Sequence, residues 1–255
     1  PQADRGTRGR VQLLEFVIYS SMKVHAFSFT CSRDLEMSEL MKYTLRKHCH
    51  QLARIEVTNT NEMPYGNGAG WDASMIKLSA LRDICKYVDD YDWVLSVDSD
   101  VVFCNTQVFD WVNVVGSFRL NNYGILGIHQ VGPLAKCHLG ELHNMSGCSI
   151  YLRGGIAKRI ANLTSEELVS VREQFKAYVL TENEDIVISY LAQLVGANPL
   201  PIPDFMYYGN FEEDIQKQTL KSFYHYNYLP SSFLGEPTTG KWDIPRVLRQ
   251  KGIDL

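Results

Sequence analysis

The chain of 255 residues lacks several features that mark specialised classes of protein. It has no run of about 18 apolar residues, so we expect no membrane span in it. Its 25 basic and 29 acidic residues give a net charge of −4, which does not favour nucleic acid as a partner. No two of its six cysteines have Cys-x-x-Cys spacing, which argues against a zinc knuckle.

The cysteines bear on the compartment in which the protein works. They are scattered, and some, such as Cys85 and Cys104, lie in apolar stretches. Buried thiols of this kind are typical of a reducing compartment, so we expect a cytoplasmic protein. Two segments, Asn144-Met145-Ser146 and Asn162-Leu163-Thr164, match the N-glycosylation sequon. They keep open the alternative of a Golgi or ER lumenal fragment that lacks its membrane anchor.

The chain does show a regular alternation of strand-like and helix-like segments. Hydrophobic residues make up 45% and charged residues 21%, as in ordinary globular proteins. We expect strands at 24–30, 53–58, 93–97, 124–128 and 149–152, and helices at 35–49, 73–88, 155–162, 166–180 and 185–195. Such alternation predicts an α/β fold with a mostly parallel central sheet flanked by helices. The Pro-, Tyr- and Gly-rich stretch after Asn198 is expected to be mainly loop.

The triplet Asp98-Ser99-Asp100 is the sharpest chemical feature, and it directly follows the apolar run 93–97. Open parallel sheets bind ligands at the carboxyl ends of their strands. Two carboxylates there are costly to keep charged without a partner, and a divalent cation is a natural partner. Carboxylate oxygens suit Mg²⁺ or Mn²⁺, which also bind diphosphates. The alternative is a turn whose aspartates accept hydrogen bonds from backbone amides.

Residues 91–103 resemble the Asp-x-Asp segment of GT-A glycosyltransferases. The helix over 77–88 lies where that superfamily has the helix before its own Asp-x-Asp. The order of elements is similar over roughly 22–230, and it is most like the family 8-like group that includes glycogenin and the lipopolysaccharide glycosyltransferases. The resemblance implies a single Rossmann-like GT-A domain.

This domain is expected over 22–255, after a tail or linker over 1–21. The resemblance divides it into a nucleotide-sugar half over 22–120 and a loop-rich acceptor half over 121–255.

The resemblance also implies a metal and donor site. Asp98, Asp100 and the late His225 are the expected ligands of Mn²⁺ or Mg²⁺, and a neutral imidazole suits that role. The nucleotide should lie across the ends of the first strands and near the start of the helix before the triplet. The residues expected to contact the donor are Thr30, Cys31, Ser32, Asp72, Lys77 and Ser99.

A second group of residues is expected at the sugar and the acceptor. The segment from Asn144 to Leu152 resembles the family's strand that lines the sugar pocket, where Gly147 would let the backbone approach the sugar. Tyr208 is expected at the acceptor. Glu184 or Asp185 is expected beside the anomeric carbon or the acceptor hydroxyl. The alternative is that this acidic cluster caps the following helix.

Together these features predict a metal-dependent glycosyltransferase that moves a sugar from a nucleotide-sugar, expected to be a UDP-sugar, to a glycan or other hydroxyl acceptor. The family 8-like layout favours retention of configuration over inversion. One alternative is a haloacid-dehalogenase-like phosphatase with Asp98 as nucleophile, although the later acidic motif of that class is missing. Another is a carbohydrate-binding domain that has the same fold and lacks catalysis.

Overall fold

The computed structural model describes residues 22–31, 35–60, 69–117, 123–129, 136–137, 140–141, 145–178, 184–207, 213–214 and 217–225. The expected tail over 1–21 lies outside them. The elements in chain order are β1 (Val24–Cys31), α1 (Leu35–His48), β2 (Leu52–Thr60), α2 (Ala69–Ile84), β3 (Trp93–Val97), β4 (Val101–Phe103), α3 (Gln107–Ser117), β5 (Tyr123–His129), β6 (Lys136–Cys137), β7 (Gly140–Glu141), β8 (Met145–Arg153), α4 (Gly154–Ala161), α5 (Ser165–Tyr178), α6 (Glu184–Leu194), β9 (Asn198–Pro201) and β10 (Phe223–His225). The predicted α/β fold is confirmed.

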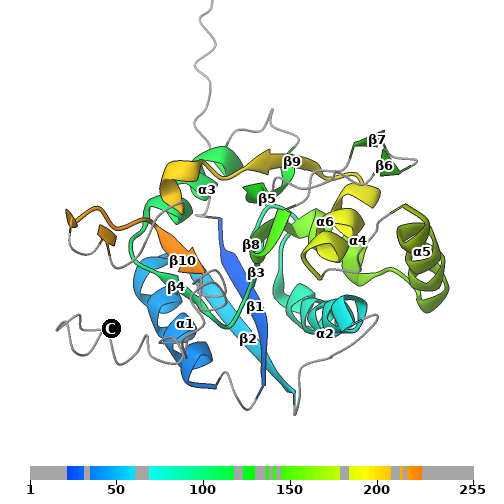
Figure 1. Cartoon of the computed structure of the whole chain (residues 1–255), viewed down its shortest axis with the longest axis horizontal. Helices are drawn as coiled ribbons and strands as arrows, with labels where there is room; N and C mark the ends of the chain where they lie inside the picture. Colours follow the sequence, from blue (N-terminus) through cyan, green and yellow to red (C-terminus); the bar gives the residue numbers. More distant parts are fainter. Residues whose placement is uncertain are drawn as a thin grey trace, which may run out of the picture.

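A six-stranded sheet in the order β2-β1-β3-β8-β5-β9 forms the centre of the molecule (Figure 1). β1 pairs in parallel with β2 and β3, and β5 pairs in parallel with β9. β8 lies between β3 and β5 and is antiparallel to both. Five of its six strands therefore run in one direction, which confirms a mostly parallel sheet.

The direction of one neighbour of β3 differs from the prediction. The run 93–97 was expected inside a parallel sheet, yet it pairs antiparallel with β8 on one side. All five residues of β3 are buried. A strand buried on both faces shows the same apolar run whichever way its neighbour points, so the sequence pattern could not reveal the direction.

Helices cover both faces of the sheet, as a sheet with two apolar faces requires. Figure 1 shows α1 on one side and α2 on the other. α2 supplies Leu78, Leu81 and Ile84, each no more than 1% exposed, to the core that it shares with α4 and α6. These positions recur at helical spacing, which is why α2 forms and packs by this face. The second core lies between the other face and α1, α3, β4 and β10.

The C-terminal stretch contains more regular structure than predicted, because β9 and β10 lie in a region expected to be mainly loop. Pro199 and Pro201 fall within β9, which is the edge strand, where a residue without an N–H is tolerated. β10 has three residues and pairs with β4, so its partner lies far away in the chain. Neither element has a local pattern that would have revealed it.

The described residues also bear on the compartment. Among them, no helix has the length and apolar character needed to cross a membrane. Burial raises the pKa of the Cys85 thiol to about 11 and those of Cys49 and Cys104 to about 12. These three cysteines are free thiols, and the compartment stays a prediction. Asn162 of one sequon is exposed between α4 and α5, and Asn144 of the other lies outside the described residues.

Candidate active site

The Asp-Ser-Asp triplet lies at the edge of the sheet where the parallel strands end. Asp98 directly follows β3, and its N–H donates to the carbonyl oxygen of Cys148 on β8 at 3.1 Å. The N–H of Val101 donates to the carbonyl oxygen of Asp98 at 3.2 Å. The resulting turn carries Ser99 and Asp100 from β3 into β4. This is the edge at which open α/β sheets bind ligands.

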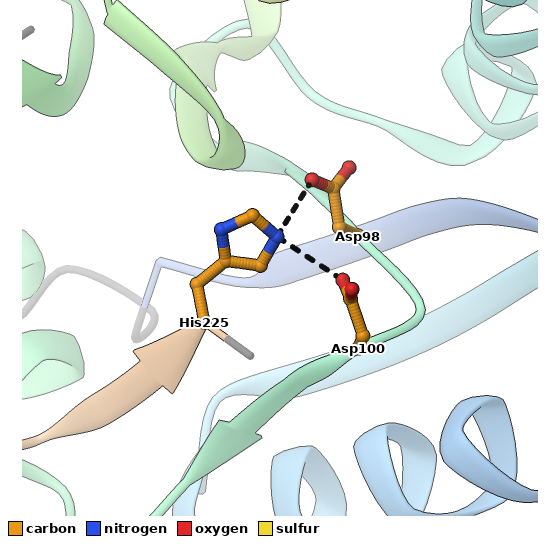
Figure 2. A group of neighbouring side chains, drawn as sticks. All are labelled: Asp98, Asp100 and His225. Carbon is orange, nitrogen blue, oxygen red and sulfur yellow. Dashed lines mark ion pairs between the residues drawn. The ribbon is translucent and has the colours of Figure 1, made fainter. Parts of the chain in front are cut away.

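The side chains of Asp98, Asp100 and His225 converge at this edge (Figure 2). His225 Nε2 lies 3.1 Å from Asp100 Oδ1 and 3.5 Å from Asp98 Oδ2. One possible ligand atom from each of the three residues lies within 4.8 Å of the others. The side chain of Asp98 is 22% exposed, that of His225 12% and that of Asp100 6%. Two carboxylates and an imidazole form a donor set that fits Mn²⁺ or Mg²⁺.

His225 reaches the triplet because β10 pairs antiparallel with β4. In that register His225 lies opposite Val101, the residue after Asp100. Phe223 lies on the same face of β10 as His225, because alternate residues of a strand share a face. Phe223 is fully buried, and its ring centroid lies 5.8 Å from that of Phe103. The aromatic contact therefore holds the strand that carries the histidine.

Lys77 makes the closest described contact to the triplet. Its Nζ donates to Asp98 Oδ1 at 2.7 Å, and its side chain is only 1% exposed. It also lies 5.4 Å from the centroid of the Phe29 ring on β1. A buried ammonium is costly unless it is paired, so Lys77 and Asp98 depend on each other. The described contacts of the Asp98 carboxylate are thus with Lys77 and His225 rather than with the backbone amides of a capped turn.

The sequence predicted Lys77 at the donor but gave no sign of this ion pair. Lys77 lies on α2, which packs against β1, and Asp98 follows the neighbouring strand β3. The contact depends on how helix and sheet pack, and no residue spacing reports it. The sequence does show that Lys77 shares a helix face with the buried residues Ala73 and Leu81, so its ammonium needs a partner.

Among the other residues expected at the nucleotide, three are buried, one is exposed and one lies outside the described residues. Thr30 and Cys31 end β1, and both are 2% exposed. Ser99 is 8% exposed within the triplet turn, whereas Asp72 is exposed in the first turn of α2. The remaining residue, Ser32, lies outside the described residues. Their roles at a donor stay predictions.

Gly147 lies in β8 beside Cys148, whose carbonyl oxygen receives the N–H of Asp98. Its backbone therefore runs along the same edge as the triplet. Its contact with a sugar stays a prediction, and the other two residues expected at sugar and acceptor, Asn144 and Tyr208, lie outside the described residues.

The start of α6 also lies toward this edge. Ser189 Oγ accepts the N–H of Met145 and donates to its carbonyl oxygen, both at 3.1 Å, so α6 is fastened to the first residue of β8. Glu184 and Asp185 begin α6, roughly one turn before Ser189 at about 1.5 Å per residue. Their side chains lie outside the described part of the chain, so the choice between catalysis and helix capping stays open.

The turn before β10 contains a backbone conformation that favours glycine. Gln218 has φ +56°, and the N–H of Thr219 donates to the carbonyl oxygen of Asp214 at 2.9 Å. We expect Gln218→Gly to raise the free energy of unfolding by about 1 kcal/mol, because glycine has no Cβ to clash in the left-handed region. Urea unfolding measures this as a higher midpoint. Gln218→Ala keeps the Cβ and should bring no gain; an equal gain would contradict the explanation.

No family model matches the sequence, and neither does any curated protein. Solved structures do resemble it. An active-site mutant of the galactosyltransferase LgtC matches with a TM-score of 0.54 and 12% identity, covering 89% of this chain and 95% of that one. A glycosyltransferase involved in glycosylation of the major capsid of PBCV-1 matches with a TM-score of 0.52 and 11% identity, covering 89% and 99%. The fold is GT-A.

A third solved structure, the glycosyltransferase GlyE of Streptococcus pneumoniae TIGR4, matches this GT-A chain with a TM-score of 0.50 and 15% identity. The alignment covers 91% of this chain and 64% of GlyE. Identities this low establish the GT-A fold and not the activity, because one fold can support many functions. The residues of the site, rather than the fold, therefore bear on the activity.

Proposed function

We propose that this GT-A chain is a metal-dependent glycosyltransferase, which moves a sugar from a nucleotide-sugar, expected to be a UDP-sugar, to a hydroxyl of a glycan or other acceptor. The observation that carries the proposal is the convergence of Asp98, Asp100 and His225 at the carboxyl edge of the sheet. The fold supports it, because the solved structures that share it are named as glycosyltransferases, one of them with donor and acceptor sugar analogues.

The three residues would hold Mn²⁺ or Mg²⁺ through two carboxylates and an imidazole. When bound, such an ion offsets the negative charge that develops on a diphosphate leaving group. The three side chains already lie together, since the β3–β4 turn carries the aspartates and the β4–β10 pairing brings the histidine beside them. These side chains then need little rearrangement when the metal and the nucleotide-sugar bind.

Lys77 contributes a positive charge at the same place. Asp98 and Asp100 lie close together in a small, largely buried site, and two negative charges at short range repel each other. The ion pair at 2.7 Å offsets part of this negative charge and brings the ammonium of Lys77 beside the triplet. We expect this ammonium to face the diphosphate of the donor as well.

The remaining roles are those that the family resemblance leads us to expect. The ends of β1, at Thr30 and Cys31, would border the nucleotide, and the backbone at Gly147 would border the sugar. Asp185 or Glu184 would be the general base in an inverting enzyme. In a retaining enzyme, which we favour, an acidic group there would stabilise positive charge on the sugar instead.

A thermal-shift screen of nucleotide-sugars with and without Mn²⁺ tests the proposal. A ligand that binds only the folded protein raises the melting temperature, and at about 100 times its Kd it adds about 2.7 kcal/mol. For a chain of this size we expect a rise of about 5 °C or more with one UDP-sugar, and only when Mn²⁺ is present. The same rise in EDTA, or no rise with any nucleotide-sugar, would count against a metal-bridged donor.

A turnover assay then separates the alternatives. Mn²⁺-dependent release of UDP from the donor found in the screen is expected of a transferase, which usually also hydrolyses its donor slowly. A carbohydrate-binding domain would bind the donor without releasing UDP. A haloacid-dehalogenase-like phosphatase would instead hydrolyse a phosphate monoester in the absence of any sugar.

A further inference from the structure

β10 is too short to hold His225 in place by backbone pairing alone. It has three residues, and so does its partner β4. A two-stranded ribbon of this size has little stability by itself in water. His225 is the last described residue of the strand, and its imidazole lies 3.1 Å from Asp100. Other contacts must therefore hold β10 against β4.

Asn105 holds the chain just before β10. Its Nδ2 donates to the carbonyl oxygens of Leu220 and Lys221 at 3.3 and 3.2 Å, and its Oδ1 accepts from Ser222 Oγ at 2.9 Å. The N–H of Cys104 also donates to the carbonyl oxygen of Ser222 at 2.8 Å. These hydrogen bonds stop at residue 222. Phe223 then packs against Phe103, and a further hydrogen-bonded contact holds the residue after it.

Tyr224 supplies that contact through its hydroxyl, which donates to Asp214 Oδ2 at 2.8 Å and accepts the N–H of Lys221 at 2.8 Å. Asp214 Oδ1 accepts a further hydrogen bond from Thr219 Oγ1 at 3.3 Å. Tyr224 is 5% exposed and Asp214 8%.

The geometry separates this pair from the metal ligands. Successive residues of a strand face opposite sides, so Tyr224 lies on the face of β10 away from His225. Among the described contacts, the hydroxyl of Tyr224 binds Asp214 and Lys221 and makes none with the Asp-Ser-Asp triplet. We therefore expect its effect on the site to pass through the backbone that it shares with His225.

We propose that Asp214 and Tyr224 are a positioning pair, which fixes the end of β10 and thereby sets where His225 lies in the metal site. The inference rests on the proposed function, because it assumes that His225 binds the metal. It adds two residues that touch neither metal nor donor. Such supporting hydrogen bonds typically change metal affinity by about 10- to 100-fold.

Mn²⁺ affinity of the donor-free protein, measured by isothermal titration calorimetry, tests the pair. Tyr224→Phe removes only the hydroxyl, and we expect it to weaken Mn²⁺ binding about tenfold. Asp214→Ala should do the same, whereas Asp214→Asn keeps an acceptor oxygen and should recover most of the affinity. Because the two residues act through one hydrogen bond, the double variant Tyr224→Phe/Asp214→Ala should bind no more weakly than either single variant.

Tyr207→Phe is the matched control. Its hydroxyl donates to Asp204 at 2.8 Å, and its ring stacks on Phe223 with centroids 6.1 Å apart, yet it lies outside β10. It should leave Mn²⁺ affinity within about twofold of the parent protein. Hydrogen exchange of the metal-free protein gives a second readout, in which Tyr224→Phe should speed exchange at residues 223–225 and Tyr207→Phe should not.

The outcomes distinguish this inference from the proposed function. If His225→Ala weakens Mn²⁺ binding but Tyr224→Phe and Asp214→Ala bind as the parent does, the positioning pair is wrong and the metal site stands. Equal weakening by Tyr207→Phe would also overturn the pair, since it would indicate general loosening. If neither His225→Ala nor Asp100→Asn changes Mn²⁺ affinity, the metal site itself is wrong, and the proposed function falls with it. Should Tyr224→Phe fail to fold, the comparison of Asp214→Asn with Asp214→Ala decides.

Discussion

Asp100→Asn is expected to lower metal-dependent sugar transfer by about 10³-fold while the protein still folds. Asp100 is nearly buried, and its Oδ1 faces the imidazole of His225 at 3.1 Å. Asparagine keeps the size of the side chain and removes its negative charge, so the site loses a charged ligand without losing packing. Removing one electrostatic contributor from a catalytic site commonly costs about 10²–10³-fold in rate, and a direct metal ligand belongs at the upper end.

The measurement is kcat/KM for the donor found by thermal shift, together with Mn²⁺ affinity and the melting temperature. Asp83→Asn is the matched control, because Asp83 is an exposed aspartate of α2 whose described partner is Lys86 at 2.7 Å. It should leave transfer unchanged. Near-normal turnover by Asp100→Asn would remove the basis for a metal-dependent mechanism. Loss of transfer together with weaker Mn²⁺ binding and an unchanged melting temperature would agree with the proposal.

The layers of the fold were predictable because their signals are local. The buried run at Trp93–Val97 and the apolar stripe of α2 each repeat with the period of their element. The buried run also drew attention to the triplet, because two aspartates directly after a buried strand are costly to keep charged unless they have a partner. These elements form around buried faces, and the spacing of apolar residues in the sequence indicates which residues are buried.

What the sequence could not reveal depends on contacts between distant segments. The antiparallel direction of β8, the short β10 and the Lys77–Asp98 ion pair all arise from tertiary packing. α3 was not predicted either, although Val108, Phe109 and Val112 line its buried side. His225 is an intermediate case: its closeness to the triplet was expected only from the family resemblance. The structure brings the three side chains together, while their role as metal ligands stays a proposal.

Lys77→Met is expected to separate metal binding from turnover. The ammonium of Lys77 competes with a cation for Asp98 Oδ1, which it contacts at 2.7 Å. Methionine keeps the unbranched shape of the lysine stem without the charge, so Mn²⁺ should bind the donor-free protein several-fold more tightly. Turnover should nevertheless fall about 100-fold, because the positive charge that we place beside the diphosphate is gone.

The control for charge is Lys86→Met, since Lys86 pairs with Asp83 at the same distance on the exposed end of the same helical stretch. It should change neither quantity. Lys77→Arg keeps the charge but not the shape of the side chain. Its Mn²⁺ affinity and its turnover should therefore lie between those of the parent protein and those of Lys77→Met. If Lys77→Met lowers Mn²⁺ affinity and turnover in parallel, Lys77 serves to orient Asp98 and does not act on the donor. Opposite changes in the two quantities are the result expected if the same ammonium balances the aspartate in the free protein and the diphosphate in the complex.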